Sequence, residues 1–196
     1  GVSQWGEETS LNDRSIGIEV VNNFTCNGSL RKLSPEQPID LDCNFPSYPE
    51  SQLEILIVLI EEILGRHPEI DPVDIVAHAD IAPNRKSDPG PQFPWEELYN
   101  RGIGAWYDVD ATHKYLGQLE TQPATISELQ CALLNYGYPV EVTGEHDTQS
   151  KLAFRAFQLH FRPARYNGLV DNETAAILYA LNEKYDRGLS NTNCEI

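Results

Sequence analysis

The chain has 196 residues, enough for one domain or two small ones, and its hydrophobic content of 40% is sufficient for a folded core. The 14 Lys and Arg against 30 Asp and Glu give a formal net charge of −16, which argues against binding to nucleic-acid phosphates or to anionic membrane surfaces. No apolar run approaches the ~20 residues that a transmembrane helix needs.

The first predicted element is a strand over residues 15–22, where apolar residues alternate with small or polar ones. On a pleated strand, Ile16 and Ile18 share one face and Gly17 and Glu19 share the other. The alternation therefore predicts that Glu19 projects away from the core, beside a glycine that leaves room for another group to approach.

Residues 23–49 are rich in Asn, Pro and Ser and predict a long irregular excursion, a feature that is often functional. Ser47-x-x-Glu50 then matches a helix capping box. Apolar residues recur after it at helical spacing, and Gly65 is a plausible stop. Because strand, helix and strand follow in order, we predict an α/β fold with a mixed central sheet flanked by helices.

A short apolar run at residues 73–77 predicts a second strand, buried, with His78 at its end. The next residues, with two prolines and Asn84-Arg85-Lys86-Ser87, predict a loop that ends at Asp88 before a Pro-Gly turn. An imidazole at a strand end and a carboxylate on a pinned loop suit a mononuclear zinc site. Lys86 would place a cation where an anionic intermediate forms.

A further helix is predicted over residues 94–101, with Trp95 and Trp106 as packing residues. Residues 108–119 show no clear periodicity and are predicted to be a linker.

The pattern then changes to a compact module of three helices, and a capping box at Thr125-x-x-Glu128 opens the first. A weak repeat with a period of 24 residues follows, in which each Gly marks a turn and each Asp is a good N-cap. The pairs in register are Gly144/Gly168, Asp147/Asp171, Ser150/Thr174, Ala153/Ile177 and Phe154/Leu178. The helical spacing of Phe154, Phe157 and Phe161 predicts core residues rather than a platform for glycans.

Four cysteines are present, and pairing Cys26 with Cys43 and Cys131 with Cys194 would fit an oxidising compartment. Four cysteines allow three pairings, among which the sequence does not choose. A free buried thiol is an equal alternative for Cys131, which lies in a helical pattern.

Three stretches resemble a known family: residues 11–19, the loop at 78–90 and the segment at 90–95. The string His-Ala-Asp-Ile-Ala-Pro…Arg-Lys-x-Asp-Pro-Gly is highly specific. On these motifs residues 1–107 resemble the zinc-dependent N-acetylmuramoyl-L-alanine amidases of the AmpD and AmiD type, which are related to animal peptidoglycan-recognition proteins.

Residues 120–185 resemble a peptidoglycan-binding module, and residues 186–196 are predicted to be a tail. The AmiD subgroup, a periplasmic outer-membrane lipoprotein, has the same two-part order. The matching residues of the module are Leu129-Gln130, Gly137-Tyr138, Ala156-Phe157-Gln158 and Phe161-Arg162-Pro163.

The resemblance implies hydrolysis of the amide between N-acetylmuramic acid, ordinary or anhydro, and L-alanine in peptidoglycan or muropeptides. It implies one Zn²⁺ held by two His and one Asp, of which His78 and Asp88 match the second His and the Asp. Glu19 matches the glutamate that handles the proton, and Lys86 the lysine that steadies the oxyanion. Arg85 is a candidate contact for a stem-peptide carboxylate, although a solvated surface position fits it equally well.

The first zinc histidine of the family has no match, because the chain has no His before His67 and the loop around His67 does not fit. We expect this ligand upstream of Gly1, and a cleaved upstream segment would then be a partner of this chain. The absence of Met predicts a processed product. The resemblance places the full-length form in the periplasm as an outer-membrane-anchored lipoprotein, with its anchor outside this chain.

Two other functions remain open at this stage. One is a non-catalytic peptidoglycan-recognition protein, and the other is a zinc peptidase that cuts within the stem peptide. His113, His146 and His160 show no ligand spacing and are predicted to be surface or packing residues. Asp80 is predicted to hold the loop in place.

Overall fold

The computed structural model describes residues 3–28, 30, 39, 41–187 and 194. Its elements in chain order are β1 (Gln4–Trp5), β2 (Glu8–Thr9), the 3₁₀ helix η1 (Leu11–Asp13), β3 (Thr25–Asn27), β4 (Asp42–Asn44), α1 (Glu50–Arg66), the 3₁₀ helix η2 (Pro72–Asp74), α2 (His78–Ile81), α3 (Trp95–Asn100), α4 (Val109–Thr121), α5 (Ile126–Tyr136), α6 (Thr148–Phe161) and α7 (Asn172–Lys184).

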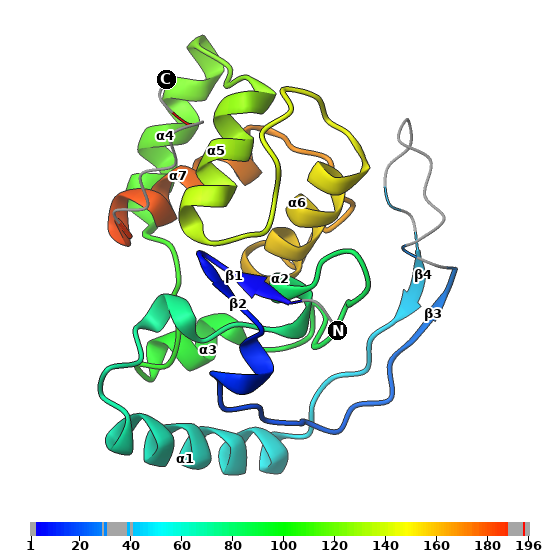
Figure 1. The fold of residues 1–196 in the computed structure, drawn as a ribbon, viewed down its shortest axis with the longest axis vertical. Helices are drawn as coiled ribbons and strands as arrows, with labels where there is room; N and C mark the ends of the chain where they lie inside the picture. The colour runs from blue at the N-terminus through cyan, green and yellow to red at the C-terminus, as the bar shows by residue number, and fades with distance from the viewer. Residues whose placement is uncertain (1–2, 29, 31–38, 40, 188–193, 195–196) are drawn as a thin grey trace.

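Helices α4 to α7 gather at one end of the molecule, and α1 and α3 lie at the other (Figure 1). The β1–β2 pair and α2 lie between these two groups, and the β3–β4 pair projects to one side (Figure 1). Both strand pairs are antiparallel. Small sheets with helices and a separate helical group agree with the predicted α/β class with a small helical domain.

Residues 15–22 form no strand, so this prediction is wrong for the structure. A strand exists only where a neighbour completes its ladder of backbone hydrogen bonds, and alternation cannot supply that neighbour. In the part of the chain that is described, no strand pairs with this segment. Ile16 and Ile18, predicted to face the core, are 52% and 38% exposed.

The predicted irregular excursion at 23–49 contains β3 and β4, so it is not without structure. Cys26 and Cys43 stand opposite each other in this pair and form a disulfide. Within the excursion, residues 29, 31–38 and 40 lie outside the described residues. The second predicted pair is also bridged, between Cys131 and Cys194, so the free thiol at Cys131 is excluded.

Helix α1 is present where the apolar spacing predicts it, and it ends one residue beyond Gly65. Its buried residues are Leu56, Ile57 and Ile60. The predicted capping box is wrong: Pro49, not Ser47, is the N-cap, and no side chain caps the helix. The backbone at Pro49 is extended, with φ of −60° and ψ of 137°, and the helix begins after it.

The apolar run before His78 is not a strand either. Its first residues belong to η2, and residues 75–77 have no strand partner in the described part. His78 instead begins the four-residue helix α2, and the loop predicted after it is present. Trp95, which begins α3, and Trp106 are both 7% exposed, which confirms their packing role.

The predicted linker at 108–119 is wrong. Asp108 is the N-cap of helix α4, and residues 109–119 form most of that helix. Oδ1 of Asp108 accepts from the backbone N–H groups of Asp110 and Ala111 at 3.0 Å and caps the helix. Thr112 and Leu119 are the buried residues of α4, and Tyr115 and Leu116 pack beside them at helical spacing. The helix packs along α7, which the sequence pattern did not indicate.

Helices α5, α6 and α7 confirm the predicted module, and their caps confirm the repeat. Thr125 caps α5 in a capping box with Glu128. Asp147 and Asp171 cap α6 and α7 through the N–H groups three residues later. The paired glycines share a left-handed backbone, with φ of 75° at Gly144 and 76° at Gly168. The same local sequence therefore produces the same turn and cap twice.

One hydrophobic core runs through both ends of the molecule. It joins Trp5, Leu56 and Leu98 to residues of the helical module, among them Phe154, Phe157 and Phe161, which are at most 1% exposed. The predicted core role of the three phenylalanines is therefore confirmed. None of the described helices combines the length and the apolar character needed to cross a membrane.

Candidate functional site

The segment from α2 to Gly90 brings the side chains of His78, Lys86 and Asp88 together. Nδ1 of His78 lies 2.5 Å from Oδ2 of Asp88. Nζ of Lys86 lies 3.8 Å from Oδ1 of the same carboxylate. The N–H of Ala79 donates to the carbonyl oxygen of Asp88 at 3.0 Å, so a backbone hydrogen bond closes the loop.

These three side chains are partly open to solvent. The exposed fractions are 42% for His78, 32% for Asp88 and 34% for Lys86. The side chains that carry the donor atoms therefore face solvent in part, while the Ala79–Asp88 hydrogen bond holds the backbone of the loop.

The far end of the loop is fixed by buried groups. The hydroxyl of Tyr48 donates to the carbonyl oxygen of Pro89 at 3.0 Å. Burial, with a further contribution from the charge of Asp88, raises the pKa of Tyr48, so this phenol stays a neutral donor. Gly90 follows with φ of 84°, and a Cβ there would lie 2.3 Å from the ring of Phe45. Glycine is therefore required at this turn.

The near end of the loop is fixed by Asp80, which is fully buried. Its carboxylate accepts from the N–H of Ala77 at 2.8 Å, from the hydroxyl of Tyr138 at 2.7 Å and from Nδ1 of His160 at 2.9 Å. The prediction that Asp80 holds the loop is confirmed. The sequence did not reveal its partners, which lie 58 and 80 residues away.

The donor set suits zinc in type, because zinc binds imidazole nitrogen and carboxylate oxygen. His78 and Asp88 supply one donor of each kind, and in this structure the two atoms are in direct hydrogen-bond contact. Among the residues that the structure describes, no third His, Cys, Asp or Glu joins them in a group that could hold a metal ion. The residues thus fit two positions of a three-ligand site.

Glu19 and Arg85 are the other predicted site residues. Glu19 is exposed on the irregular segment before β3, and it does not join His78 and Asp88 in a metal-binding group. Arg85 is half-buried in the loop, and its N–H donates to the carbonyl oxygen of Ala82.

The remaining histidines have the surface or packing roles predicted for them. His113 is exposed, whereas His146 places Nε2 2.9 Å from the carbonyl oxygen of Gly168. His160 is 4% exposed and stacks on Trp95, with ring centroids 3.8 Å apart. A signal for its role was available, since His160 is a polar residue within the apolar pattern of a buried helix.

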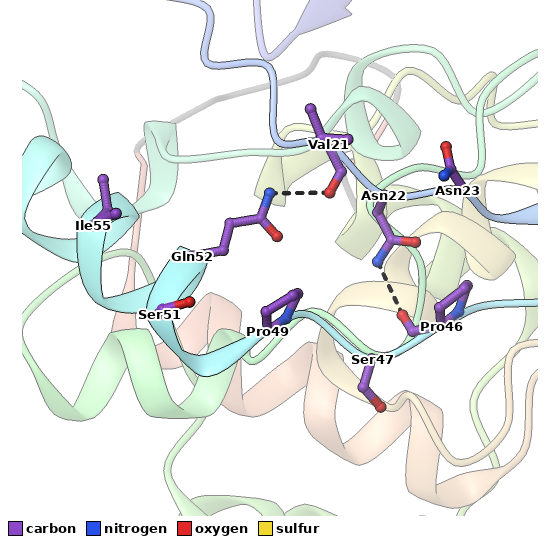
Figure 2. Close-up of a pocket in the computed structure, with 9 residues that line it drawn as sticks. All are labelled: Val21, Asn22, Asn23, Pro46, Ser47, Pro49, Ser51, Gln52 and Ile55. Atoms are coloured by element: carbon purple, nitrogen blue, oxygen red, sulfur yellow. Dashed lines mark hydrogen bonds between the residues drawn. The ribbon is translucent and has the colours of Figure 1, made fainter.

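A shallow groove of about 660 Å³ lies on the surface beside the start of α1, as Figure 2 shows. Its lining residues are Val21, Asn22, Asn23, Pro46, Ser47, Pro49, Ser51, Gln52 and Ile55. Gln52 donates to the carbonyl oxygen of Val21 at 3.0 Å and so ties the irregular segment to α1. None of the predicted site residues lines this groove, so it is a different place from the pair of His78 and Asp88.

Two family models and several known proteins match this chain. Residues 2–91 match the family model for N-acetylmuramoyl-L-alanine amidase, and residues 122–178 match that for a peptidoglycan binding domain. The chain is 42% identical to N-acetylmuramoyl-L-alanine amidase AmiD of Escherichia coli over 187 residues, which are 94% of this chain and 63% of that protein. It therefore spans less than two thirds of this relative. It is also 33% identical to 1,6-anhydro-N-acetylmuramyl-L-alanine amidase AmpD of Enterobacter cloacae, over 50% of this chain and 42% of that protein.

Solved structures show the same likeness. The structure of AmpDh3 from Pseudomonas aeruginosa in complex with anhydromuramic pentapeptide has a TM-score of 0.83 and 44% identity, over 95% of this chain and 68% of that one. The structure of AmiD from E. coli in complex with anhydro-N-acetylmuramic acid-L-Ala-D-gamma-Glu-L-Lys has a TM-score of 0.77 and 40% identity, over 95% and 68%. Both likenesses cover nearly the whole chain and confirm the predicted fold class.

Proposed function

This chain belongs to the N-acetylmuramoyl-L-alanine amidase family, and from that premise we propose that the protein hydrolyses the amide bond between N-acetylmuramic acid and L-alanine. The substrates are peptidoglycan or its muropeptides, with the sugar in the ordinary or the anhydro form. The observation that carries this proposal is the convergence of His78 and Asp88, with Lys86 beside them, on the loop that the family motif predicts.

We assign one Zn²⁺ to this point, with His78 and Asp88 as two of its ligands and a His upstream of Gly1 as the third. When bound, zinc supplies Lewis-acid polarisation of a carbonyl group and lowers the pKa of a water molecule to about 7. The support is that an imidazole nitrogen and a carboxylate oxygen, both donors that zinc accepts, lie side by side on side chains that are partly exposed.

We assign Lys86 the role of stabilising the negative charge that develops on the carbonyl oxygen of the scissile amide. Its ammonium already lies against the Asp88 carboxylate, so the loop holds this cation at the reaction centre before substrate binds. Removing one such preorganised partner typically costs about 3–4 kcal/mol of transition-state stabilisation. Arg85, on the same loop, is assigned to a carboxylate of the stem peptide.

We assign Glu19 the role of general base and general acid. It takes a proton from the attacking water and returns it to the leaving amine of L-alanine. General acid–base catalysis of this kind contributes roughly 10²–10⁴-fold to a rate. The support is the match of Glu19 to the family motif and its exposure, which leaves the carboxylate accessible.

We propose the periplasm as the location, with the full-length protein anchored to the outer membrane as a lipoprotein. The two disulfides support an oxidising compartment. The proposed partners are peptidoglycan and muropeptides, together with the upstream segment that would carry the third ligand.

The test is a parallel measurement of zinc content and muropeptide cleavage on the full-length protein. Its variants are His78→Ala, Glu19→Gln and Lys86→Met, with His113→Ala as an exposed-histidine control. We expect His78→Ala to lose zinc and activity, because a ligand is gone. Glu19→Gln and Lys86→Met should keep zinc and lose turnover by at least 10²-fold.

Mass spectrometry of the products separates the proposal from its rivals. An amidase releases the whole stem peptide from the muramyl sugar, whereas a stem peptidase releases a shorter peptide. Zinc-free muropeptide binding without cleavage would identify a recognition protein instead. Turnover at the wild-type rate in Glu19→Gln would remove this residue from the mechanism.

A further inference from the structure

Helix α6 of the helical module reaches into the loop that carries His78 and Asp88. In Figure 1, α6 lies directly above α2. Two of its polar residues, Arg155 and His160, are 2% and 4% exposed, and each contacts the loop.

His160 acts on the beginning of the loop through Asp80. Because an ionised carboxylate only accepts hydrogen bonds, the bond to Asp80 assigns the ring proton of His160 to Nδ1. The same carboxylate oxygen accepts from the N–H of Ala77, the residue immediately before His78. Nδ1 of His160 and the backbone at His78 are therefore connected through one buried acceptor.

Arg155 acts on the end of the loop through Ser87, which is 7% exposed and lies between Lys86 and Asp88. Nη1 of Arg155 donates to the hydroxyl oxygen of Ser87 at 3.0 Å. One helix thus holds the loop at both ends, two residues after His78 and one residue before Asp88.

We propose that α6 of the helical module is a positioning element of the amidase site, with His160 and Arg155 as positioning residues for His78 and Asp88. This inference rests on the proposed function. It makes the module part of the unit that presents the metal ligands, in addition to any contact that it makes with peptidoglycan.

A simpler view is that these contacts only join two parts of the molecule. The apolar core already does so, since it runs continuously from Trp5 to Ile177. Buried polar groups are not needed for adhesion, and here they carry a cost, because Nε and Nη2 of Arg155 and Nε2 of His160 are buried without a hydrogen-bond partner among the described residues. Groups that do not bind the metal but orient its ligands through hydrogen bonds are different: their removal typically changes metal affinity or activity by roughly 10–100-fold.

Two substitutions at one position separate positioning from packing. His160→Phe keeps an aromatic ring on Trp95 but loses the N–H to Asp80, whereas His160→Asn keeps an N–H near Nδ1 but loses the ring. Tyr138→Phe is a milder companion, because it removes only the hydroxyl that donates to Asp80. The control is Gln158→Leu on the same helix, whose lost hydrogen bonds lie within the module, at Gly168, Leu169 and Thr174.

Two readouts are measured on the full-length protein: zinc affinity by chelator competition, and amide hydrogen exchange of a peptide covering residues 77–88 in the metal-free state. We expect His160→Phe and Tyr138→Phe to weaken zinc binding about 10-fold and to accelerate exchange in this peptide about 10-fold. His160→Asn and Gln158→Leu should stay within about 3-fold of wild type in both.

If His160→Asn weakens zinc binding and accelerates exchange more than His160→Phe does, the ring packing of His160 matters more than its N–H, and the proposal is overturned. If Gln158→Leu changes zinc affinity and exchange as much as His160→Phe does, general destabilisation of the module explains both, and the proposal is also overturned. If the wild type binds no zinc, the proposed function fails, and the exchange of residues 77–88 alone decides whether His160 restrains the loop.

Discussion

The repeated N-caps offer a test of how tertiary context changes the same local motif. Asp147 and Asp171 occupy matching positions in the 24-residue repeat, and each accepts from the N–H three residues later. Asp171 also accepts from Nη1 of Arg162 at 2.7 Å and from Nη1 of Arg165 at 2.6 Å. Asp147 accepts instead from the hydroxyl of Thr143 at 3.1 Å.

The magnitude follows from these partners. Asparagine is as good an N-cap as aspartate, and its amide can donate to the Thr143 hydroxyl in place of the bond it loses, so Asp147→Asn should cost mainly the dipole interaction, about 0.5 kcal/mol. Asp171→Asn also loses two ion pairs. The pair with Arg165, 46% exposed, is worth about 0.5 kcal/mol, and the pair with Arg162, 11% exposed, about 1–1.5 kcal/mol. We expect a total near 2 kcal/mol and a Tm about 4–6 °C below that of wild type.

Thermal and urea unfolding of both variants at neutral pH measure this difference. Partial burial acts to raise the pKa of Asp171, but hydrogen bonds from Thr174 and Arg162 outweigh it and lower the pKa. The ionised form is therefore favoured in the folded state. Its stabilisation is present above the unfolded pKa of about 3.9 and disappears as the pH falls through the lower folded value, so the deficit of Asp171→Asn should shrink in acid. Equal losses for the two variants at neutral pH would refute the reasoning.

Two further predictions concern steric fit and alkaline stability. Gly168→Ala should cost about 2–4 kcal/mol in urea unfolding, because φ is 76° and the new Cβ would lie 2.5 Å from the carbonyl oxygen of Lys151. Gly102→Ala, with φ of 81° but no atom within 4 Å, should cost only about 1–2 kcal/mol, and equal losses would contradict the steric argument. Burial, followed by the charges of Glu128 and Tyr115, raises the pKa of Tyr179 to about 12. The stability that its neutral form provides should therefore be complete below pH 10 and be lost as the pH rises toward 12, and an alkaline unfolding curve unchanged by Tyr179→Phe would contradict this.

The sequence by itself determined the features that depend on neighbours along the chain. Caps at Thr125, Asp147 and Asp171 were readable because side chain and N–H lie three residues apart. The loop from His78 to Asp88 was readable because its prolines and short span constrain the backbone locally. The convergence of the two side chains was expected from that loop, but the contacts from α6 that hold its two ends were not.

Only the tertiary structure decided the features that need a distant partner. Residues 15–22 carry a strand pattern, yet without a neighbouring strand in the described part they form none. Helix α4 packs along α7, a partner that its own sequence did not indicate. The buried bond between Asp80 and His160 joins residues 80 positions apart. A local pattern specifies which donors, acceptors and apolar side chains a segment carries. A hydrogen bond or a packed contact also needs a partner, and the tertiary fold determines which distant residue lies close enough to be that partner.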